Sequence, residues 1–232
     1  MKIFRFAALF TIFLCSIQIF SQTVPPESDV QAWSEVQLTF PVIKKKDEKG
    51  KEFDQLTFFL VGNLRFGQNL RHFVDERIGF GLDFRVNKNL SLTSAYLYIA
   101  AQPLKNRREF ENRLRLAATV EKKFRRFSLK DRNLFEYRIR NSRSDSTRYR
   151  NRLTFAFPVL KNDKEIFSPF AANEIYYDFS TKNVTRNEVS AGISRKINSN
   201  VSTDIFYLWR RNRGNVLTNV NVIGANLKIR ID

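Results

Sequence analysis

Residues 148–157, RYRNRLTFAF, combine two kinds of side chain that rarely share one environment. Three arginines occupy alternate positions, at Arg148, Arg150 and Arg152, and mostly apolar or aromatic residues stand between and after them. Successive side chains of an extended strand point to opposite faces. The stretch therefore predicts a strand with a cationic face and an apolar face, each meeting different surroundings.

The same period of two recurs along the chain, whereas no convincing helical period is present. The candidate strands are residues 31–43, 53–66, 73–86, 89–100, 107–120, 127–140, 147–160, 166–180, 185–197, 200–211 and 215–231. Short polar links join them, and no linker is long enough to separate two domains. A single antiparallel meander is the simplest chain path.

Strand length indicates a membrane. The candidate segments reach twelve or more residues, whereas strands of soluble domains are mostly about 5–6 residues long. A tilted membrane-spanning strand needs roughly 9–11 residues. We expect an all-β fold, a single antiparallel up-and-down transmembrane β-barrel of about 10–12 strands. Twelve is preferred because such barrels usually have an even strand number, so either a further strand lies near residues 23–30 or one of the segments is misread.

Alternation by itself also fits a soluble antiparallel sheet with its apolar face inward. Two other features favour the membrane. Long strands in lipid need closure, since unpaired edges would stay unsatisfied. Aromatic residues recur near the ends of the segments, as interface girdles require. These residues are Tyr96, Tyr98, Tyr137, Tyr149, Tyr176, Tyr177, Tyr207 and Trp209.

The N-terminus predicts export. Residues 1–21 combine the positive residues Lys2 and Arg5 with a short apolar stretch, which is typical of a secretory signal peptide. Cys15 raises the alternative of a lipoprotein signal, but Leu14 precedes it where a small residue is usual. We expect a signal peptide at 1–21, a lead at 22–30 and the barrel at 31–232. The expected location is the outer membrane of a Gram-negative cell.

Several short elements resemble a family of secreted bacterial proteins. They are QAWSEV at 31–36, ENRLRL at 111–116, RNLFEYRIR at 132–140, RYRNRL at 148–153, ANEIYY at 172–177 and TRNEVSAGIS at 185–194. That family is classified as a domain of unknown function and is regarded as an outer-membrane β-barrel. The resemblance implies a fold and a location, and it implies no activity.

Charged residues of one parity should line the lumen. The candidates are Arg113, Arg115, Arg132, Glu136, Arg138, Arg148, Arg150, Arg152, Glu174 and Glu188. Arginine suits such a wall because its planar group stays charged and grips carboxylates or phosphates in pairs. The residues predict either a porin-like narrow path or binding site for small anionic solutes, or an internal ion-pair network. With an internal ion-pair network, the protein would be a closed structural barrel without transport. A third alternative is a soluble, secreted, lipocalin-like binding barrel.

Other partners and chemistries find little support. The net charge of +17 would suit nucleic acid, but an exported protein rarely meets it, so we expect outer-membrane lipid and the outer-membrane assembly machinery as partners. His72 is the single histidine. We expect no catalytic residues, no metal and no cofactor. Small barrels can be lipid-modifying enzymes, but no residue set here supports that activity.

The short links at 87–88 and 198–199 are expected to be periplasmic turns.

Overall fold

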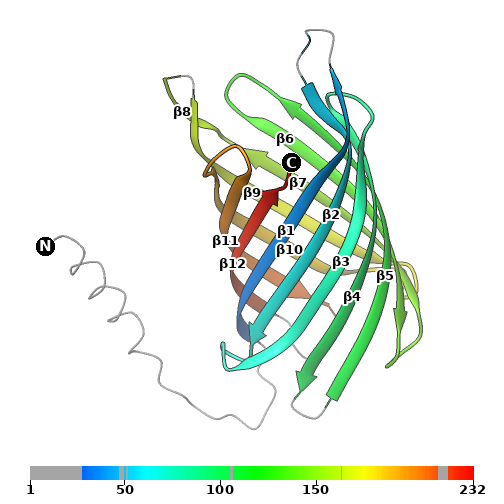
Figure 1. The fold of residues 1–232 in the computed structure, drawn as a ribbon. Coiled ribbons are helices and arrows are strands. Elements are labelled where there is room, and N and C mark those ends of the chain that lie inside the picture. Colours follow the sequence, from blue (N-terminus) through cyan, green and yellow to red (C-terminus); the bar gives the residue numbers. More distant parts are fainter. Residues whose placement is uncertain (1–27, 47–49, 51, 105–106, 163, 214–218) are drawn as a thin grey trace, which may run out of the picture.

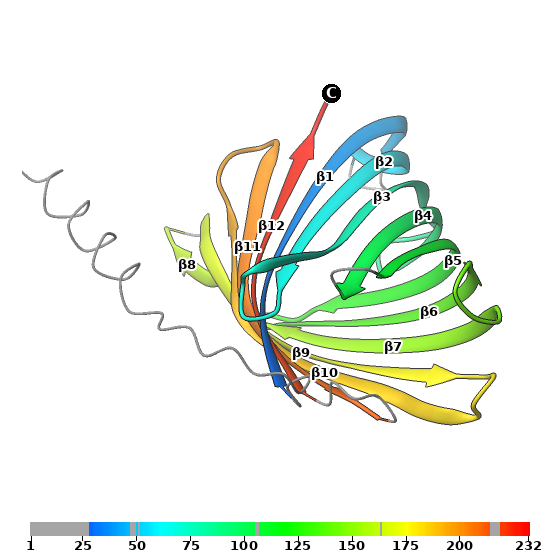
Figure 2. The ribbon, with the colours of Figure 1, turned by 90° about the horizontal axis from the view of Figure 1, so that it is seen from below.

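The computed structural model describes residues 28–46, 50, 52–104, 107–162, 164–213 and 219–232. Eleven strands close into one barrel and a twelfth, β8, pairs with β9 outside the ring (Figure 1). The strands are β1 (Ser28–Lys46), β2 (Glu52–Gly67), β3 (His72–Arg85), β4 (Leu90–Leu104), β5 (Arg107–Lys123), β6 (Ser128–Arg140), β7 (Ser146–Ala156), β8 (Val159–Lys161), β9 (Lys164–Asp178), β10 (Asn183–Lys196), β11 (Val201–Asn212) and β12 (Asn219–Arg230). Seen from below, the ring surrounds one interior (Figure 2). The expected signal peptide at 1–21 lies outside the described residues.

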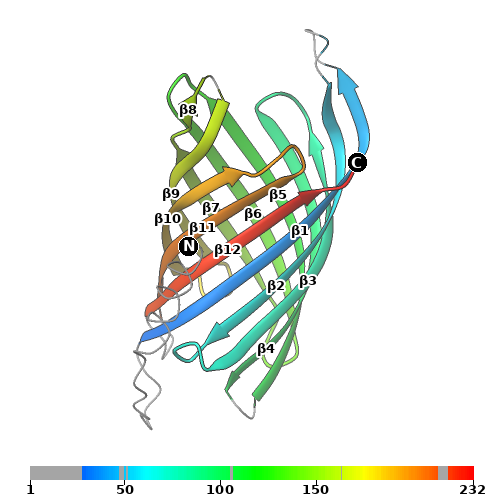
Figure 3. The ribbon, with the colours of Figure 1, turned by 60° about the vertical axis from the view of Figure 1, so that its left-hand side comes forward.

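The ring closes through a parallel pair. β1 and β12 run side by side in the same direction, with Ser28 opposite Asn219 and Thr39 opposite Arg230 (Figure 3). All other neighbours in the ring are antiparallel. The preference for twelve barrel strands was therefore wrong, because a parallel closing pair permits an odd number. The two described ends of the chain consequently lie at opposite ends of the barrel.

The segment predicted at 147–160 is divided. β7 ends at Ala156, and β8 follows as a three-residue strand from Val159 to Lys161. Pro158 lies between them and cannot donate a backbone hydrogen bond to a neighbouring strand, which favours a break here. The upper part of β9 pairs with β8, and its lower part pairs with β7.

Two ends of the barrel are distinguished below. The upper end, at the top of Figure 1, has the β1–β2, β3–β4, β5–β6 and β10–β11 connections and Asp232. There Arg230 pairs with Asp54 of β2 and with Asp232, and Lys44 lies 3.7 Å from Asp232. The hydrogen bond from Arg230 lowers the pKa of the Asp232 carboxyl. The lower end has the β2–β3, β4–β5, β6–β7 and β9–β10 connections and Ser28.

The outer wall is apolar and the interior is charged. Ile78, Leu116 and Ile223 point outward with 66%, 63% and 63% of their surface exposed, whereas Glu136 is completely buried inside. A soluble barrel has the reverse arrangement. This inversion is the pattern of a membrane-spanning barrel and does not fit the lipocalin-like alternative. The described residues contain no helix long and apolar enough to cross a membrane.

Aromatic side chains gather on the outer wall towards both ends. Near the upper end, Phe124 stacks on Phe127, with ring centroids 4.5 Å apart. Near the lower end, Phe135 packs against Tyr149 with centroids 5.2 Å apart. Two such levels flanking an apolar band are what interfacial girdles require. Tyr176, which was expected among these girdle residues, is instead an inward, buried residue.

Candidate functional site

All of the predicted lumen residues lie on the inward faces of β5, β6, β7, β9 and β10. They are Arg113, Arg115, Arg132, Glu136, Arg138, Arg148, Arg150, Arg152, Glu174 and Glu188. Alternation in the sequence places them on one face, and strand register decides which of them meet. The structure brings them into one continuous network of ion pairs and hydrogen bonds.

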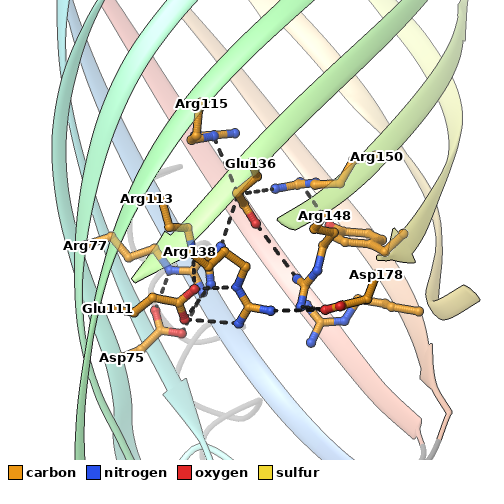
Figure 4. A network of polar contacts seen from close by, with 12 residues as sticks. Asp75, Arg77, Glu111, Arg113, Arg115, Glu136, Arg138, Arg148, Arg150 and Asp178 are labelled. Carbon is orange, nitrogen blue, oxygen red and sulfur yellow. Dashed lines mark hydrogen bonds and ion pairs between the residues drawn. The ribbon is translucent and has the colours of Figure 1, made fainter. Parts of the chain in front are cut away.

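Glu136 is the centre of that network (Figure 4). It is the register partner of Arg115 on β5 and of Arg148 on β7. One carboxylate oxygen lies 3.4 Å from both Arg113 and Arg150 and 3.7 Å from Arg115, and the other lies 3.9 Å from Arg148. Four guanidinium groups thus converge on one fully buried carboxylate.

Glu174 on β9 is a second centre, two strands further round the ring. Arg150 and Arg132 lie 2.8 and 2.9 Å from its carboxylate, and Arg152 lies 3.6 Å away. Its register partner on β10 is Glu188. Two directly opposed carboxylates would repel each other, and the surrounding arginines offset that repulsion.

Tyr176 and Glu188 continue the network across β10 and β11. The Tyr176 hydroxyl donates to Glu188 at 2.9 Å and accepts from Arg150 at 3.0 Å. Arg210, which faces Glu188 in the β10–β11 register, donates to it at 2.7 Å. The Arg150 guanidinium carbon also lies 4.4 Å from the centroid of the Tyr176 ring, within the range of a cation–π contact.

Sequence reasoning identified Arg138 and its partner Glu111 but did not assign the other participants at the lower end to the site. Arg77 pairs with Asp75 at 2.7 Å, and Arg138 pairs with Glu111 and, at 3.8 Å, with Asp178. The Trp33 ring lies between two guanidinium groups, 3.5 Å from that of Arg65 and 4.5 Å from that of Arg210. All of these residues share the inward parity of their strands. That parity was the available signal, but it does not show which strands face each other.

Solvent exposure divides the lumen into two regions. We call Glu111, Arg113, Glu136, Arg138, Arg148, Arg150, Glu174, Tyr176, Asp178, Glu188 and Arg210 the lumen plug, because each is buried or nearly so. We call Arg115, Lys130, Arg132, Arg152 and Lys228 the upper vestibule. Their side chains are 23% to 50% exposed, and they lie between the plug and the upper end.

Positive charge is in excess where the vestibule meets the plug. Among the described residues, Arg115, Arg132, Arg150 and Arg152 form ion pairs only with the two carboxylates Glu136 and Glu174, which Arg113 and Arg148 also contact. Within the described residues, the buried Nε atoms of Arg115, Arg132 and Arg148 have no hydrogen-bond partner. Buried donors without partners are costly. The floor of the vestibule, where Arg115 and Arg132 lie above the plug, can therefore accept a small oxyanion, such as a phosphate or a carboxylate.

The described residues contain no group of three or more His, Cys, Asp and Glu side chains that could hold a metal ion. His72 lies at the start of β3.

The comparisons with known proteins concern family and overall shape. Residues 30–221 match a family described as "Protein of unknown function (DUF2490)". No curated protein matches the chain. Three solved structures are similar to it. LpxR from Salmonella typhimurium has a TM-score of 0.43 and 11% identity, over 72% of this chain and 80% of that one.

The second structure is the NanC porin, with a TM-score of 0.45 and 9% identity, over 83% of this chain and 93% of that one. The third is an anion-selective porin from Comamonas acidovorans, with a TM-score of 0.36 and 12% identity. That match covers 78% of this chain and 59% of the porin, so the chain spans little more than half of the porin's length.

Proposed function

The chain belongs to the DUF2490 family, whose description assigns no function, and we propose on that premise that it is a non-enzymatic outer-membrane β-barrel that binds small anionic solutes in its lumen. The observation that supports this most directly is a set of four arginines, Arg115, Arg132, Arg150 and Arg152, whose only carboxylate partners among the described residues are the buried Glu136 and Glu174. Arginine in a partly desolvated site attracts phosphate and carboxylate groups strongly.

Membrane insertion is supported by the outer wall. Its apolar band lies between two aromatic levels, and closure of the ring pairs each of its eleven strands with a neighbour on both sides. The N-terminal signal predicts export, after which the assembly machinery of the outer membrane would insert the barrel. The links at 87–88 and 198–199, predicted to be periplasmic turns, lie at the upper end, which we propose to face the periplasm, so that the vestibule would open there.

The solute would enter through the upper vestibule and stop at the plug. Exposure of the lumen cations falls from 50% at Lys130 to 32% at Arg152 and 9% at Arg148. The geometry therefore favours a binding site that is open at one end. Passage through the barrel would require the plug side chains to separate, which makes any path narrow and slow.

Anion binding and conductance test the proposal together. The protein folded in neutral detergent would be titrated with inorganic phosphate and with succinate in a calorimeter, and with ethanolamine as a cationic control. We expect binding of both anions and none of ethanolamine. In planar bilayers under a potassium chloride gradient, any current should be anion-selective and should decrease with Arg152→Ala.

The alternative function is a closed structural barrel that anchors or strengthens the envelope. It is favoured by one observation: Glu136 is fully buried and joins β5, β6 and β7 through ion pairs. A barrel that binds neither anion and stays sealed at every salt concentration would contradict solute binding and support this alternative.

A further inference from the structure

A small hollow lies on the outer wall near the lower end, where β9, β10 and β11 meet. Its volume is about 320 Å³, which is within the range of small-ligand sites, about 300–1,000 Å³. It is lined by Asn173, Val184, Arg186, Asn187, Val189, Trp209, Arg211 and Arg213. Most of these residues have the outward parity of their strands, so the hollow opens away from the lumen.

Local strand geometry forms the hollow. The β9–β10 register shifts between Val184 and Arg186, which is a bulge in the wall. The Arg213 amide donates to the Thr185 carbonyl at 2.9 Å, so the ladder continues beyond the end of β11. Arg211 is the register partner of Asn187. Both arginines are thereby held beside the bulge by the backbone.

The polar lining of the hollow consists of donors and amides. Within the described residues, no carboxylate lines it, and neither Arg211 nor Arg213 forms an ion pair. Asn173 donates to the Asn187 Oδ1 atom at 2.9 Å, which leaves the Asn187 amide group as a donor for a ligand. The adjacent inward residue Arg210 is neutralised by Glu188 at 2.7 Å. The outer wall therefore has two unneutralised cations at one site.

The level of the hollow matches a lipid interface. Trp209 belongs to the lower aromatic level and is 37% exposed, and Val189 beside it is 45% exposed. Tryptophan is enriched at the depth of lipid headgroups, and arginine near a strand end reaches towards the same layer. A ligand here would meet apolar contacts on the membrane side and guanidinium groups on the water side.

We propose that this hollow binds the phosphate group of an anionic lipid headgroup. Arg211 and Arg213 would neutralise the phosphate and donate hydrogen bonds to its oxygens. The Asn187 amide would donate to a further oxygen, while Val189 and Trp209 contact the glycerol and the start of the acyl chains. This inference concerns the outer wall and does not depend on anion binding in the lumen.

Native mass spectrometry of the protein in neutral detergent tests the site. The probes are phosphatidylglycerol, phosphatidylcholine and inorganic phosphate, and folding of each variant is checked by heat-dependent gel mobility. We expect one phosphatidylglycerol to be retained more strongly than phosphatidylcholine. Arg211→Gln and Arg213→Gln should each weaken its binding about fivefold, the effect expected for one cation at an anionic membrane surface.

Arg71→Gln is the matched control, because Arg71 is an exposed arginine in the β2–β3 turn at the same end of the barrel. It should change phosphatidylglycerol binding less than twofold. An equal loss with Arg71→Gln would show general charge attraction and overturn the site. Unchanged binding in both Arg211→Gln and Arg213→Gln would also overturn it. Inorganic phosphate that displaces the lipid at micromolar concentration would assign the site to free phosphate instead.

Discussion

The lumen plug and the upper vestibule are both rich in arginine, yet arginine has a different role in each. In the plug, Arg138 and Arg148 are buried on every side by partners from other strands. In the vestibule, Arg152 and Lys228 each keep about a third or more of their side-chain surface in contact with solvent. A buried charge must be compensated within the protein, whereas a solvated charge is free to attract a ligand. Arginines deep in the barrel therefore stabilise the fold, whereas cations near the upper end are available to bind a ligand.

The largest effect should come from removing the central carboxylate of the plug. Glu136→Gln keeps the shape of the side chain but leaves Arg113, Arg115, Arg148 and Arg150 without a shared counter-charge. Breaking a buried ion pair from one side costs roughly 3–5 kcal/mol. We expect the free energy of unfolding to fall by about that amount, measured by urea unfolding in micelles.

The matched change in the vestibule is Glu121→Gln. Glu121 pairs with Lys130 at 3.8 Å and is 34% exposed, so its contribution is screened by water. Its loss should lower the free energy of unfolding by less than about 1 kcal/mol. If the two variants unfolded alike, the division of the lumen into a plug and a vestibule would have no energetic basis.

A smaller effect, on binding and not on stability, is expected for Arg152→Gln. Phosphate affinity should fall about two- to fivefold, as for a partly exposed charge pair, while unfolding changes little. The loss should shrink as salt is added, since the screening length is only about 10 Å at 0.1 M. Calorimetric titration at two ionic strengths measures both effects.

Arg148→Gln is the comparison for this variant. Arg148 lies below the floor of the vestibule, 3.8 Å from Asp178 and 3.9 Å from Glu136, and is 9% exposed. Arg148→Gln should lower the free energy of unfolding more than Arg152→Gln does, and it should change the affinity for phosphate less. The reverse order would place the anion inside the plug.

The sequence predicted the wall of the barrel better than its interior. Alternation in stretches such as 148–157 placed the arginines on one face, and all eleven candidate segments correspond to strands of the ring. The predicted meander gave the order of the strands, but alternation does not give the register between neighbours, so the convergence of four arginines on Glu136 was not predictable. Tyr176 was assigned to the outer girdle although its parity is that of Glu174, because aromatic residue type was given more weight than position.

The way in which the ring closes was also not predictable from the sequence. The expectation of an even strand number came from barrels in general, and here the parallel β1–β12 pair replaces it. Its register also sets the relative height of the two lumen regions. It places Trp33, which contacts Arg65 and Arg210 beside the plug, next to Gly224, and it places Gln37 next to Lys228 of the vestibule.

The smallest expected effect on anion binding comes from a cross-link that tests this register. Ser34 and Ala225 are register partners and are both exposed on the outer wall. Neighbouring strands lie about 4.8 Å apart, which is within the range of Cα separations that a disulfide can bridge, about 4.4–6.8 Å. Ser34→Cys combined with Ala225→Cys should form an intramolecular disulfide in the folded barrel without weakening anion binding. Loss of the native Cys15 with the expected signal peptide would leave no competing thiol.

Ser34→Cys combined with Ile229→Cys is the control, because Ile229 lies four residues further along β12. At about 3.3 Å per residue the two Cα atoms would be too far apart to be bridged. A disulfide in the control and none in the test pair would mean that β12 is shifted along β1. Such a shift would move Lys228 along the barrel axis relative to Trp33. The plug and the vestibule would then exchange their positions along the axis or lie at the same level.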